Sequence, residues 1–450
     1  MNVTETLSDG LKRELAVVIP AAEIDAKLAA YMDDLRGRVR INGFRPGKVP
    51  VGHLRRLYGR QAMTEIVNEA VTESVRQAVA ERNEKPALQP AVEIPDDKLE
   101  AILSGGTDLA FSMRYEVLPE IVVGDIKSIK IERPVAEVTE EEVDAEVANI
   151  AKSVRPFEPK EGPAAEGDRV TIDFLGKLDG EPFEGGGAED FDLEIGSNRF
   201  IPGFEPQLVG LSAGEEKVIT VTFPEDYGAA NLAGKEATFD IKVKAVTAPA
   251  EVTLDDAFAQ RFGLESLDKL KEAVREQISG RYAAASRQKV KRALLDALDE
   301  THKFEVPELL LETEVDGIWR QLQADMARSG RTFEDEDTTE EEARAEYRRI
   351  AERRVRLGLV LSHVGEVNNI EVSEEEVQRA LQDELRRYPG REREIIDYYR
   401  KNQGAVAALR APIYEDKVVD YLLELATVDT KTVSKDELFA EAEEDEAAAA

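Results

Sequence analysis

Residues 200–205 read Phe200-Ile201-Pro202-Gly203-Phe204-Glu205 and lie in the most aromatic part of the chain. Seven of the fifteen phenylalanines fall between residues 161 and 248, although aromatic residues make up only 6% of the sequence. Around them, short β-rich runs such as Val170–Phe174 and Val218–Phe223 alternate with glycine and proline, and a last run covers Ala237–Val246. Runs of this kind, separated by turn residues, are typical of strands. We therefore expect residues 161–248 to form a small β domain.

Five strings in this region resemble the FKBP-type peptidyl-prolyl isomerases, and they occur in the same order. The strings are Thr171–Gly176, Pro182–Gly185, Phe200–Glu205, Pro224–Gly228 and Ala237–Asp240. The resemblance implies an antiparallel β-sheet with a short helix. It also implies a proline pocket whose lining and polar rim are Phe174, Phe183, Glu184, Phe191, Phe200, Ile201, Phe204, Tyr227 and Phe239. Two positions depart from the usual pattern, because Phe204 stands where many FKBPs have tryptophan and Glu184 where they have aspartate.

Each of these phenylalanines, taken alone, is better explained as part of the core of a β domain than as part of a pocket. The order of the five strings favours the FKBP fold. Catalysis needs no nucleophile here, because rotation about an X–Pro bond involves no proton transfer. The chain has no cysteine and only three widely separated histidines, so we expect neither a metal nor another cofactor.

The first 118 residues predict an α+β domain. Apolar residues alternate with smaller or polar ones near the end of this part, which indicates a half-buried strand. The apolar residues are Leu109, Phe111, Met113, Tyr115 and Val117. An earlier strand is expected to end at Ile19, before Pro20. Helical patterns cover Ala21–Leu35 and Gln61–Glu81.

A basic segment lies between those two helices. Residues 36–60 contain eight arginines and lysines and no acid, in a chain with 59 basic and 93 acidic residues and a formal net charge of −34. Such an island favours contact with a polyanion, whereas a solvated helix face is the plainer alternative. The overall acidity argues against a protein that coats nucleic acid along its whole surface, and we expect no DNA partner.

The centre of this basic segment, Gly43-Phe44-Arg45-Pro46-Gly47-Lys48-Val49-Pro50, matches the ribosome-docking motif of the bacterial trigger factor family without a departure. The resemblance extends over nearly the whole chain. It implies that Gly43, Phe44, Arg45, Pro46, Gly47 and Lys48 form a tip that docks on the protein and RNA of the large ribosomal subunit, beside the exit tunnel. It further implies that the chain binds nascent and unfolded polypeptides, and that it forms a weak homodimer away from the ribosome.

The remaining sequence divides by composition. Residues 119–160 are expected to be a connector with one helix, which opens at a capping box of Thr139 and Glu142. Residues 249–428 are almost entirely helical in pattern, with further capping boxes at Thr339/Glu342 and Ser373/Glu376, and the resemblance makes them a chaperone body with arms. Residues 429–450 are expected to be an acidic disordered tail, and removal of Asp436–Ala450 is expected to change neither activity.

These parts together predict a multi-domain α+β protein with an α/β docking domain, an FKBP-like domain and a large all-α domain. No run of about 18 apolar residues and no signal peptide is visible, so we expect a cytoplasmic protein. Gly210–Gly214 matches G-x-S-x-G, but a short helix is expected before it and a strand after it, the reverse of a hydrolase nucleophile elbow. Two alternatives stay open, a free prolyl isomerase and a factor that binds other RNA through the basic segment.

Overall fold

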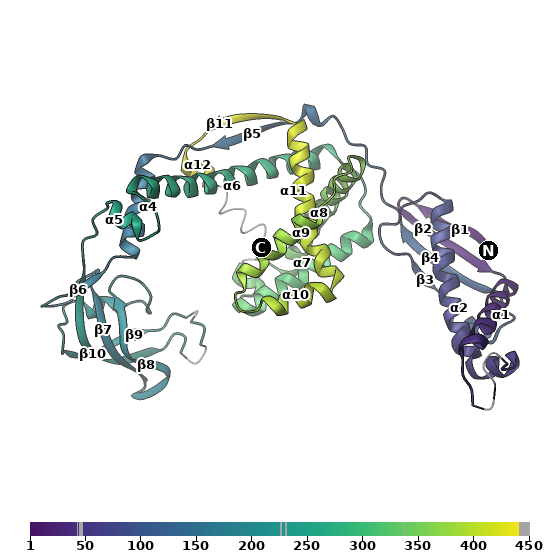
Figure 1. Cartoon of the computed structure of the whole chain (residues 1–450), viewed down its shortest axis with the longest axis horizontal. Helices are drawn as coiled ribbons and strands as arrows, with labels where there is room; N and C mark the ends of the chain where they lie inside the picture. Colours follow the sequence, from purple (N-terminus) through teal and green to yellow (C-terminus); the bar gives the residue numbers. More distant parts are fainter. Residues whose placement is uncertain (43, 45–47, 226, 230–231, 337, 441–450) are drawn as a thin grey trace. The chain divides into compact units, whose positions relative to one another are not determined.

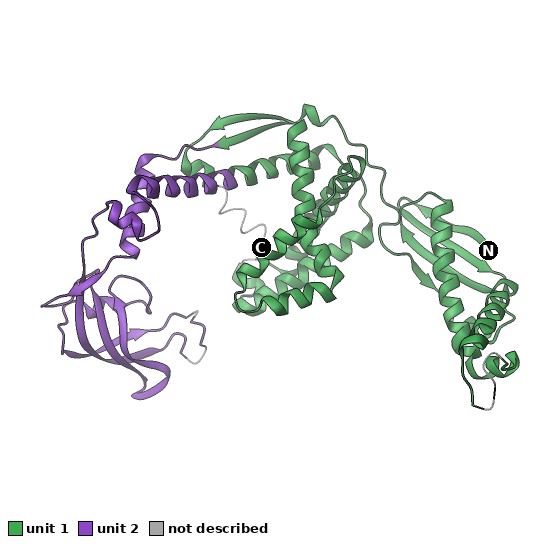
Figure 2. Ribbon diagram, in the orientation of Figure 1, with its two compact units in different colours: residues 1–134, 286–450 green, residues 135–285 purple. Residues whose placement is uncertain are grey.

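The computed structural model describes residues 1–42, 44, 48–225, 227–229, 232–336 and 338–440. The chain forms two compact units (Figure 2). One unit joins residues 1–134 to residues 286–450, and the other consists of residues 135–285. The two ends of the sequence therefore belong to one unit, and the aromatic β region belongs to the other.

The N-terminal part contains a four-stranded antiparallel sheet in the order β1-β2-β4-β3 (Figure 1). Its strands are β1 (Asn2–Asp9), β2 (Lys12–Ile19), β3 (Ala91–Glu93) and β4 (Leu109–Glu116). Leu109, Phe111, Met113 and Tyr115 are all buried, which confirms the strand predicted from their alternation. The strand ending at Ile19 is also confirmed. β1 was not predicted, because only Val3 is half-buried in this edge strand and its sequence carries no apolar alternation.

Helices pack on this sheet and share its hydrophobic core. They are α1 (Ala21–Arg38), α2 (Val51–Glu81) and α3 (Asp96–Ser104). The prediction that the second helix begins at Gln61 was wrong, because α2 begins ten residues earlier, directly after Pro50. Proline is well suited to a helix start since its fixed φ is already helical. The first turns of α2 bury Leu54 but expose their arginines, so the apolar period is weak there.

The aromatic β region is an antiparallel sheet in the order β6-β10-β7-β8, with β9 also paired to β10. Its strands are β6 (Phe157–Pro159), β7 (Arg169–Leu178), β8 (Glu181–Glu194), β9 (Glu216–Thr222) and β10 (Glu236–Pro249). A short 3₁₀ helix, η2 (Glu205–Leu208), packs against the sheet. The predicted sheet with one short helix is thus confirmed. The G-x-S-x-G match follows η2 and precedes β9, which is not the strand-then-helix setting of a nucleophile elbow.

The rest of the chain is mainly helical, as predicted. The helices are α4 (Glu140–Ser153), α5 (Asp256–Gln260), α6 (Leu267–Thr301), α7 (Glu308–Ser329), η3 (Phe333–Glu336), α8 (Glu340–Val367), α9 (Glu374–Arg387), α10 (Glu392–Lys401) and α11 (Gln403–Leu425). All three predicted capping boxes are present, at the starts of α4, α8 and α9. Leu294 and Leu298 of α6 share a buried core with residues of α8 and α11.

The C-terminal region corrects one prediction. Residues 429–440 do not belong to a disordered tail, because β11 (Thr427–Thr432) pairs with β5 (Lys130–Val135) and is followed by α12 (Lys435–Phe439). Leu438 is only 1% exposed, and the Lys289 ammonium donates a hydrogen bond to the Glu437 carbonyl. β5 follows η1 (Ile126–Ser128) in the predicted connector. The acidic residues 441–450 lie outside the described part of the chain. In that described part, no helix is both long and apolar enough to cross a membrane.

Candidate functional site

The phenylalanines of the FKBP-like sheet form one continuous cluster of ring contacts. Phe204 is at its centre and is fully buried. The centroid of its ring lies 4.5 Å from that of Phe200, 5.3 Å from that of Phe239 and 6.1 Å from that of Phe174. Most of these contacts are edge-to-face or tilted, which is the arrangement that aromatic quadrupoles favour. The sequence-predicted floor of the pocket is therefore an ordered aromatic surface.

The outer members of the cluster extend from this centre in two directions. The Phe191 ring lies 5.9 Å from Phe174 and 5.4 Å from Phe200. On the other side, Phe183 lies 6.0 Å from both Phe239 and Phe223, and Phe223 lies 4.7 Å from Tyr227. All the aromatic residues predicted for the pocket thus belong to one group. Phe223 belongs to it too but was not predicted, although its place directly before the Pro224 string could have indicated it.

Strand pairing and two glycines place these rings. Phe174 on β7 and Phe239 on β10 point to the core side of the sheet, since Ile241 pairs with Phe174 and Phe239 pairs with Gly176. A Cβ atom at Gly176 would lie 2.7 Å from the rings of both Phe183 and Phe239, and one at Gly186 would lie 2.6 Å from Phe183. Glycine at both positions therefore lets the Phe183 ring lie directly against the backbone.

The predicted rim of the cluster is open to solvent. Phe191 is 38% and Tyr227 40% exposed, and Ile201 is half-buried beside Phe200. Glu184 is exposed and has no hydrogen bond or ion pair within the described part of the chain. The side chains that line the centre are therefore fixed by packing, whereas the Glu184 side chain is free to turn in solvent.

A buried carboxylate lies directly beside the pocket floor. Glu205 is 4% exposed, and it accepts hydrogen bonds from four backbone N–H groups and one hydroxyl in residues 196–200. Burial alone would raise the pKa of Glu205, but the N–H groups of Asn198, Phe200, Gly196 and Arg199 outweigh it and hold the pKa below its ordinary value. Sequence reasoning gave Glu205 no role.

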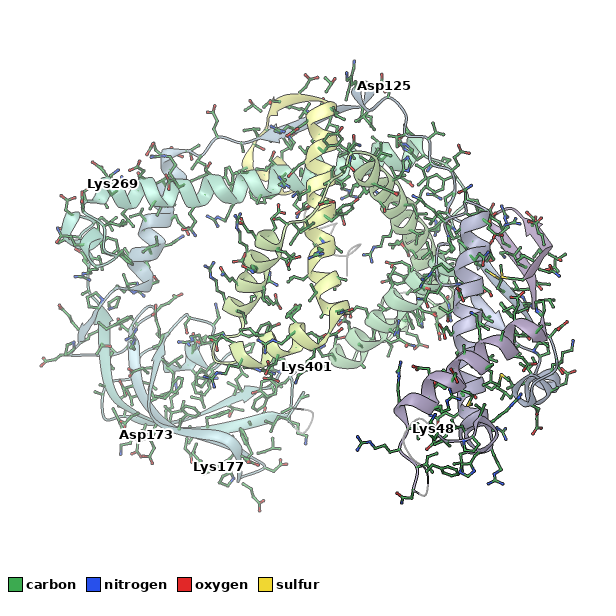
Figure 3. The ribbon with its side chains drawn as sticks, turned by 45° about the vertical axis from the view of Figure 1, so that its right-hand side comes forward. Lys48, Asp125, Asp173, Lys177, Lys269 and Lys401 are labelled. Atoms are coloured by element: carbon green, nitrogen blue, oxygen red, sulfur yellow. The ribbon has the colours of Figure 1, made fainter. Side chains whose placement is uncertain are left out.

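A cavity of about 880 Å³ opens on the opposite face of this sheet. It is lined by residues of four strands, among them the outward-facing Asp173, Leu175, Val218 and Asp240. Asp173 and Lys177, labelled in Figure 3, lie on β7 two residues before and after Leu175. Their side chains therefore lie on the same face of the strand as Leu175 and on the face opposite to Phe174. Phe174 also lines the cavity, which therefore borders the aromatic cluster at this residue.

The second predicted site is the tip between α1 and α2. Phe44 is 38% exposed, and its ring centroid lies 5.2 Å from that of His53. Val49 and Leu54 are buried beneath the tip, whereas Lys48 is exposed (Figure 3). The other predicted tip residues, Gly43, Arg45, Pro46 and Gly47, lie outside the described residues.

The basic segment around this tip is partly neutralised. Arg36 pairs with Asp33 and Arg38 with Asp34 on α1, both at 2.8 Å, and Arg55 lies 3.8 Å from Asp25. Among the residues that the structure describes, Arg40, Lys48, Arg56 and Arg60 have no ion pair. The segment also exposes two apolar residues of α2 that sequence reasoning missed, Val51 (41%) and Leu57 (54%). A prediction that α2 begins at Val51 would have placed these two apolar residues on the helix.

No group of three or more His, Cys, Asp or Glu side chains suited to a metal ion occurs in the described residues. The chain thus combines an N-terminal α/β part, an antiparallel FKBP-like sheet with an aromatic cluster, and a large helical part. Residues 1–150 match the family model described as bacterial trigger factor protein, and residues 266–424 match its C-terminal counterpart. Residues 160–244 match FKBP-type peptidyl-prolyl cis-trans isomerase.

Curated relatives agree with these matches. The chain is 59% identical over 443 residues to the trigger factor of Brucella abortus (strain S19), covering 98% of this chain and 94% of the relative. It is 56% identical over 446 residues to the trigger factor of Azorhizobium caulinodans, covering 99% of both. A solved structure of the trigger factor chaperone, described for its promiscuous substrate recognition in folding and assembly, has a similar fold, with a TM-score of 0.55, 23% identity and coverage of 94% of this chain and 99% of that one. The chain belongs to the trigger factor family.

Proposed function

We propose that the chain is a cytoplasmic chaperone that docks on the large ribosomal subunit, binds nascent polypeptides and catalyses cis/trans isomerisation of their X–Pro bonds. In this proposal residues 1–118 dock, residues 119–160 connect, residues 161–248 isomerise and residues 249–428 hold clients. These proposed functional divisions differ in their bounds from the two compact units, because helix α6 contributes residues to both units.

The observation that carries the isomerase part is the ring cluster around the fully buried Phe204. Rotation about an X–Pro bond must break amide resonance, against a barrier of roughly 18–20 kcal/mol. The twisted amide is less polar than the planar one, so an apolar aromatic surface disfavours the ground state more than the transition state. Phe174, Phe200, Phe204 and Phe239 supply that surface.

The polar part of the reaction is the orientation of the peptide. We propose that the Ile201 backbone N–H donates to a substrate carbonyl, while Tyr227 and Glu184 at the exposed rim orient the flanking chain. Within the described residues, no acceptor is found for the Ile201 N–H, which leaves it available for substrate. Phe183, Phe191 and Phe223 complete the apolar wall around the proline ring.

The docking part rests on a different observation, the exposed Phe44 among cations without ion pairs. An aromatic residue followed in the sequence by Arg45 and Lys48 suits a surface of protein and RNA, where stacking and phosphate contacts combine. Val51 and Leu57 extend the exposed apolar area along α2. The same surface explains why the segment excludes acids in an otherwise acidic chain.

Co-sedimentation with vacant bacterial 70S ribosomes at near-physiological salt tests the docking part. We expect saturable one-to-one binding by the wild type and its loss in the triple variant Phe44→Ala, Arg45→Ala, Lys48→Ala. A matched control removes one exposed phenylalanine and two exposed arginines elsewhere, as Phe262→Ala, Arg261→Ala, Arg281→Ala, and should bind like the wild type. Unchanged binding by the docking variant would favour the free isomerase instead.

The RNA-binding alternative makes a distinct prediction in the same assay. A factor that uses only the basic segment should bind many RNAs with strong salt dependence and lose little when Phe44 is replaced. Deleting residues 161–248 separates the two proposed sites, because a docking site confined to the N-terminal part should keep its ribosome affinity. A large drop in affinity after that deletion contradicts the assignment.

A further inference from the structure

Glu205 makes an unusual number of contacts for a buried carboxylate. Oε2 accepts from the backbone N–H groups of Gly196 at 2.8 Å and Asn198 at 3.1 Å. Oε1 accepts from the backbone N–H groups of Arg199 at 2.9 Å and Phe200 at 3.3 Å, and from the Ser197 hydroxyl at 3.1 Å. Removing a charge from water is costly, so a carboxylate persists in this position only because these donors replace the lost hydration.

The segment that Glu205 binds is a tight turn that local geometry alone does not favour. Gly196 has φ +93° and Asn198 has φ +54°, both in the region that most side chains avoid. The Ser197 N–H donates to the Glu194 carbonyl at 3.2 Å. Every N–H from residue 196 to residue 200 therefore has an acceptor, and four of them donate to one carboxylate. The next N–H, that of Ile201, has no acceptor in the described part of the chain.

This order of contacts places two pocket residues at the end of the turn. Phe200 both donates its N–H to Glu205 and lays its ring 4.5 Å from the ring of Phe204. Ile201 follows directly, half-buried against the same core. Because Glu205 also directly follows Phe204, the carboxylate joins the pocket floor to the turn that carries the Ile201 N–H.

We propose that Glu205 is a positioning residue of the isomerase pocket, whose carboxylate holds residues 196–200 so that the Ile201 N–H faces the substrate. The Phe200 ring is held separately, by its contacts with the rings of Phe174, Phe191 and Phe204. The inference rests on the proposed isomerase function and adds to it a residue that contacts no substrate. The Ile201 N–H would bind the planar and the twisted amide alike, so its misplacement weakens binding of both states. Loss of the Glu205 contacts should therefore raise KM and leave kcat nearly unchanged.

The variant Glu205→Gln tests this inference with little change in size. The glutamine amide keeps one acceptor oxygen but replaces the other with an NH₂ group. An NH₂ group cannot accept the hydrogen bonds that the backbone N–H groups donate to that position. We measure kcat and KM of the full-length chain on a short peptide with one X–Pro bond, by exchange NMR over a concentration series. The expected result is a rise in KM of about tenfold or more with kcat within twofold of the wild type.

Matched variants separate positioning from general damage. Glu215 is exposed and caps a turn in the same sheet region by accepting from the Ser212 N–H, so Glu215→Gln makes the same chemical change away from the pocket and should leave KM unchanged. If Glu205→Gln does not fold, Ser197→Ala removes a single donor to Oε1 and should raise KM about two- to threefold. In every variant, thermal unfolding is followed so that rates are compared below the transition.

The outcomes distinguish the two claims. A wild type without isomerase activity overturns the proposed isomerase function. An active wild type together with unchanged KM in both Glu205→Gln and Ser197→Ala overturns the positioning role alone. A fall in kcat with constant KM, or an equal effect of Glu215→Gln, likewise contradicts the inference.

Discussion

The aromatic cluster and the basic tip differ in what holds their side chains. In the cluster, Phe204 and Phe239 are buried, and their ring geometry is set by neighbouring strands before any substrate binds. At the tip, Phe44, Lys48 and Arg56 lie exposed, and among the described residues the ring found near Phe44 is that of His53. In the proposed function, the first site is complete within the chain, whereas the second is a surface that needs a partner.

This difference predicts how each site responds to substitution. A change in the buried cluster alters both stability and chemistry, because the same rings form the core and line the pocket. A change at the tip should alter binding only, and its size should depend on salt. Each of the following experiments tests whether burial, rather than residue type, decides the effect.

The largest effect is expected for Phe204→Ala. It removes the ring at the centre of the cluster, so we expect a loss of isomerase kcat/KM of at least a hundredfold and of about 3–5 kcal/mol in the stability of the FKBP-like sheet. A proline-limited refolding assay and urea unfolding measure the two, while suppression of aggregation reports client holding, which should stay largely intact. Leu175→Ala, on the other face of the sheet and 41% exposed, is the control. Equal loss of isomerisation and client holding would break the proposed division of labour.

At the tip, single substitutions should be weaker and should differ in kind. Lys48→Ala removes a phosphate contact, so ribosome affinity should fall severalfold and the slope of log K against log salt should decrease by about 0.7–0.9. Phe44→Ala should lower the affinity about tenfold with the slope unchanged, since the ring carries no charge. Affinities measured at several salt concentrations test this contrast. Identical slopes in both variants would show that Lys48 does not contact phosphate.

The aromatic cluster was predicted better than its surroundings because its residues lie in short strings that resemble the FKBP family. Phe174 and Phe239 lie on strands, whereas Phe204 directly precedes η2. Glu205 gave no such signal, because its role depends on backbone N–H groups that converge only in the folded turn. The buried Phe223 belongs to the cluster through Phe183, which lies forty residues away in the sequence.

Long-range pairing explains the clearest error. Thr427–Thr432 contains no apolar alternation, and its strand exists because β5, about 300 residues earlier, supplies the hydrogen-bond partner. The amino-acid composition indicated only the excess of acidic residues that follows this strand. The late start predicted for α2 has a different cause, because Arg55 and Arg56 hide the helical period in a stretch that buries little beyond Leu54.

The corrected C-terminal region offers a test of burial that is independent of both sites. Truncation after Lys435 removes Leu438, which is 1% exposed. We expect it to lower the stability of the compact unit that contains α12 by about 1–3 kcal/mol. Removal of residues 441–450 alone is the control and should leave the urea midpoint unchanged. Neither truncation should change ribosome binding or isomerisation. Equal midpoints for both truncated chains would mean that Leu438 contributes nothing to the core.

The smallest effect concerns a second carboxylate that caps a backbone N–H group, one that is half-buried instead of fully buried. Glu376 at the start of α9 accepts from the Ser373 N–H and hydroxyl, and Lys417 of α11 lies 2.9 and 3.0 Å from its oxygens. The Ser373 N–H first, and then Lys417, lower the pKa of Glu376 to about 2. The folded state thus favours the ionised form, so this stabilisation is complete above the unfolded pKa of about 4.3 and is lost as the pH falls toward 2.

We therefore expect Glu376→Gln to unfold slightly earlier than the wild type at pH 7, with the difference shrinking between pH about 4.3 and 2. Solvent screening keeps the effect small, in contrast to the KM change expected for the buried Glu205. Urea midpoints at several pH values measure it. Glu375→Gln on the same helix, whose side chain is 84% exposed, should show no such pH dependence. A difference between Glu376→Gln and wild type that persists unchanged at pH 2 would mean that side-chain size or helix propensity, and not the charge, causes it, and the contrast between the two carboxylates would then fail.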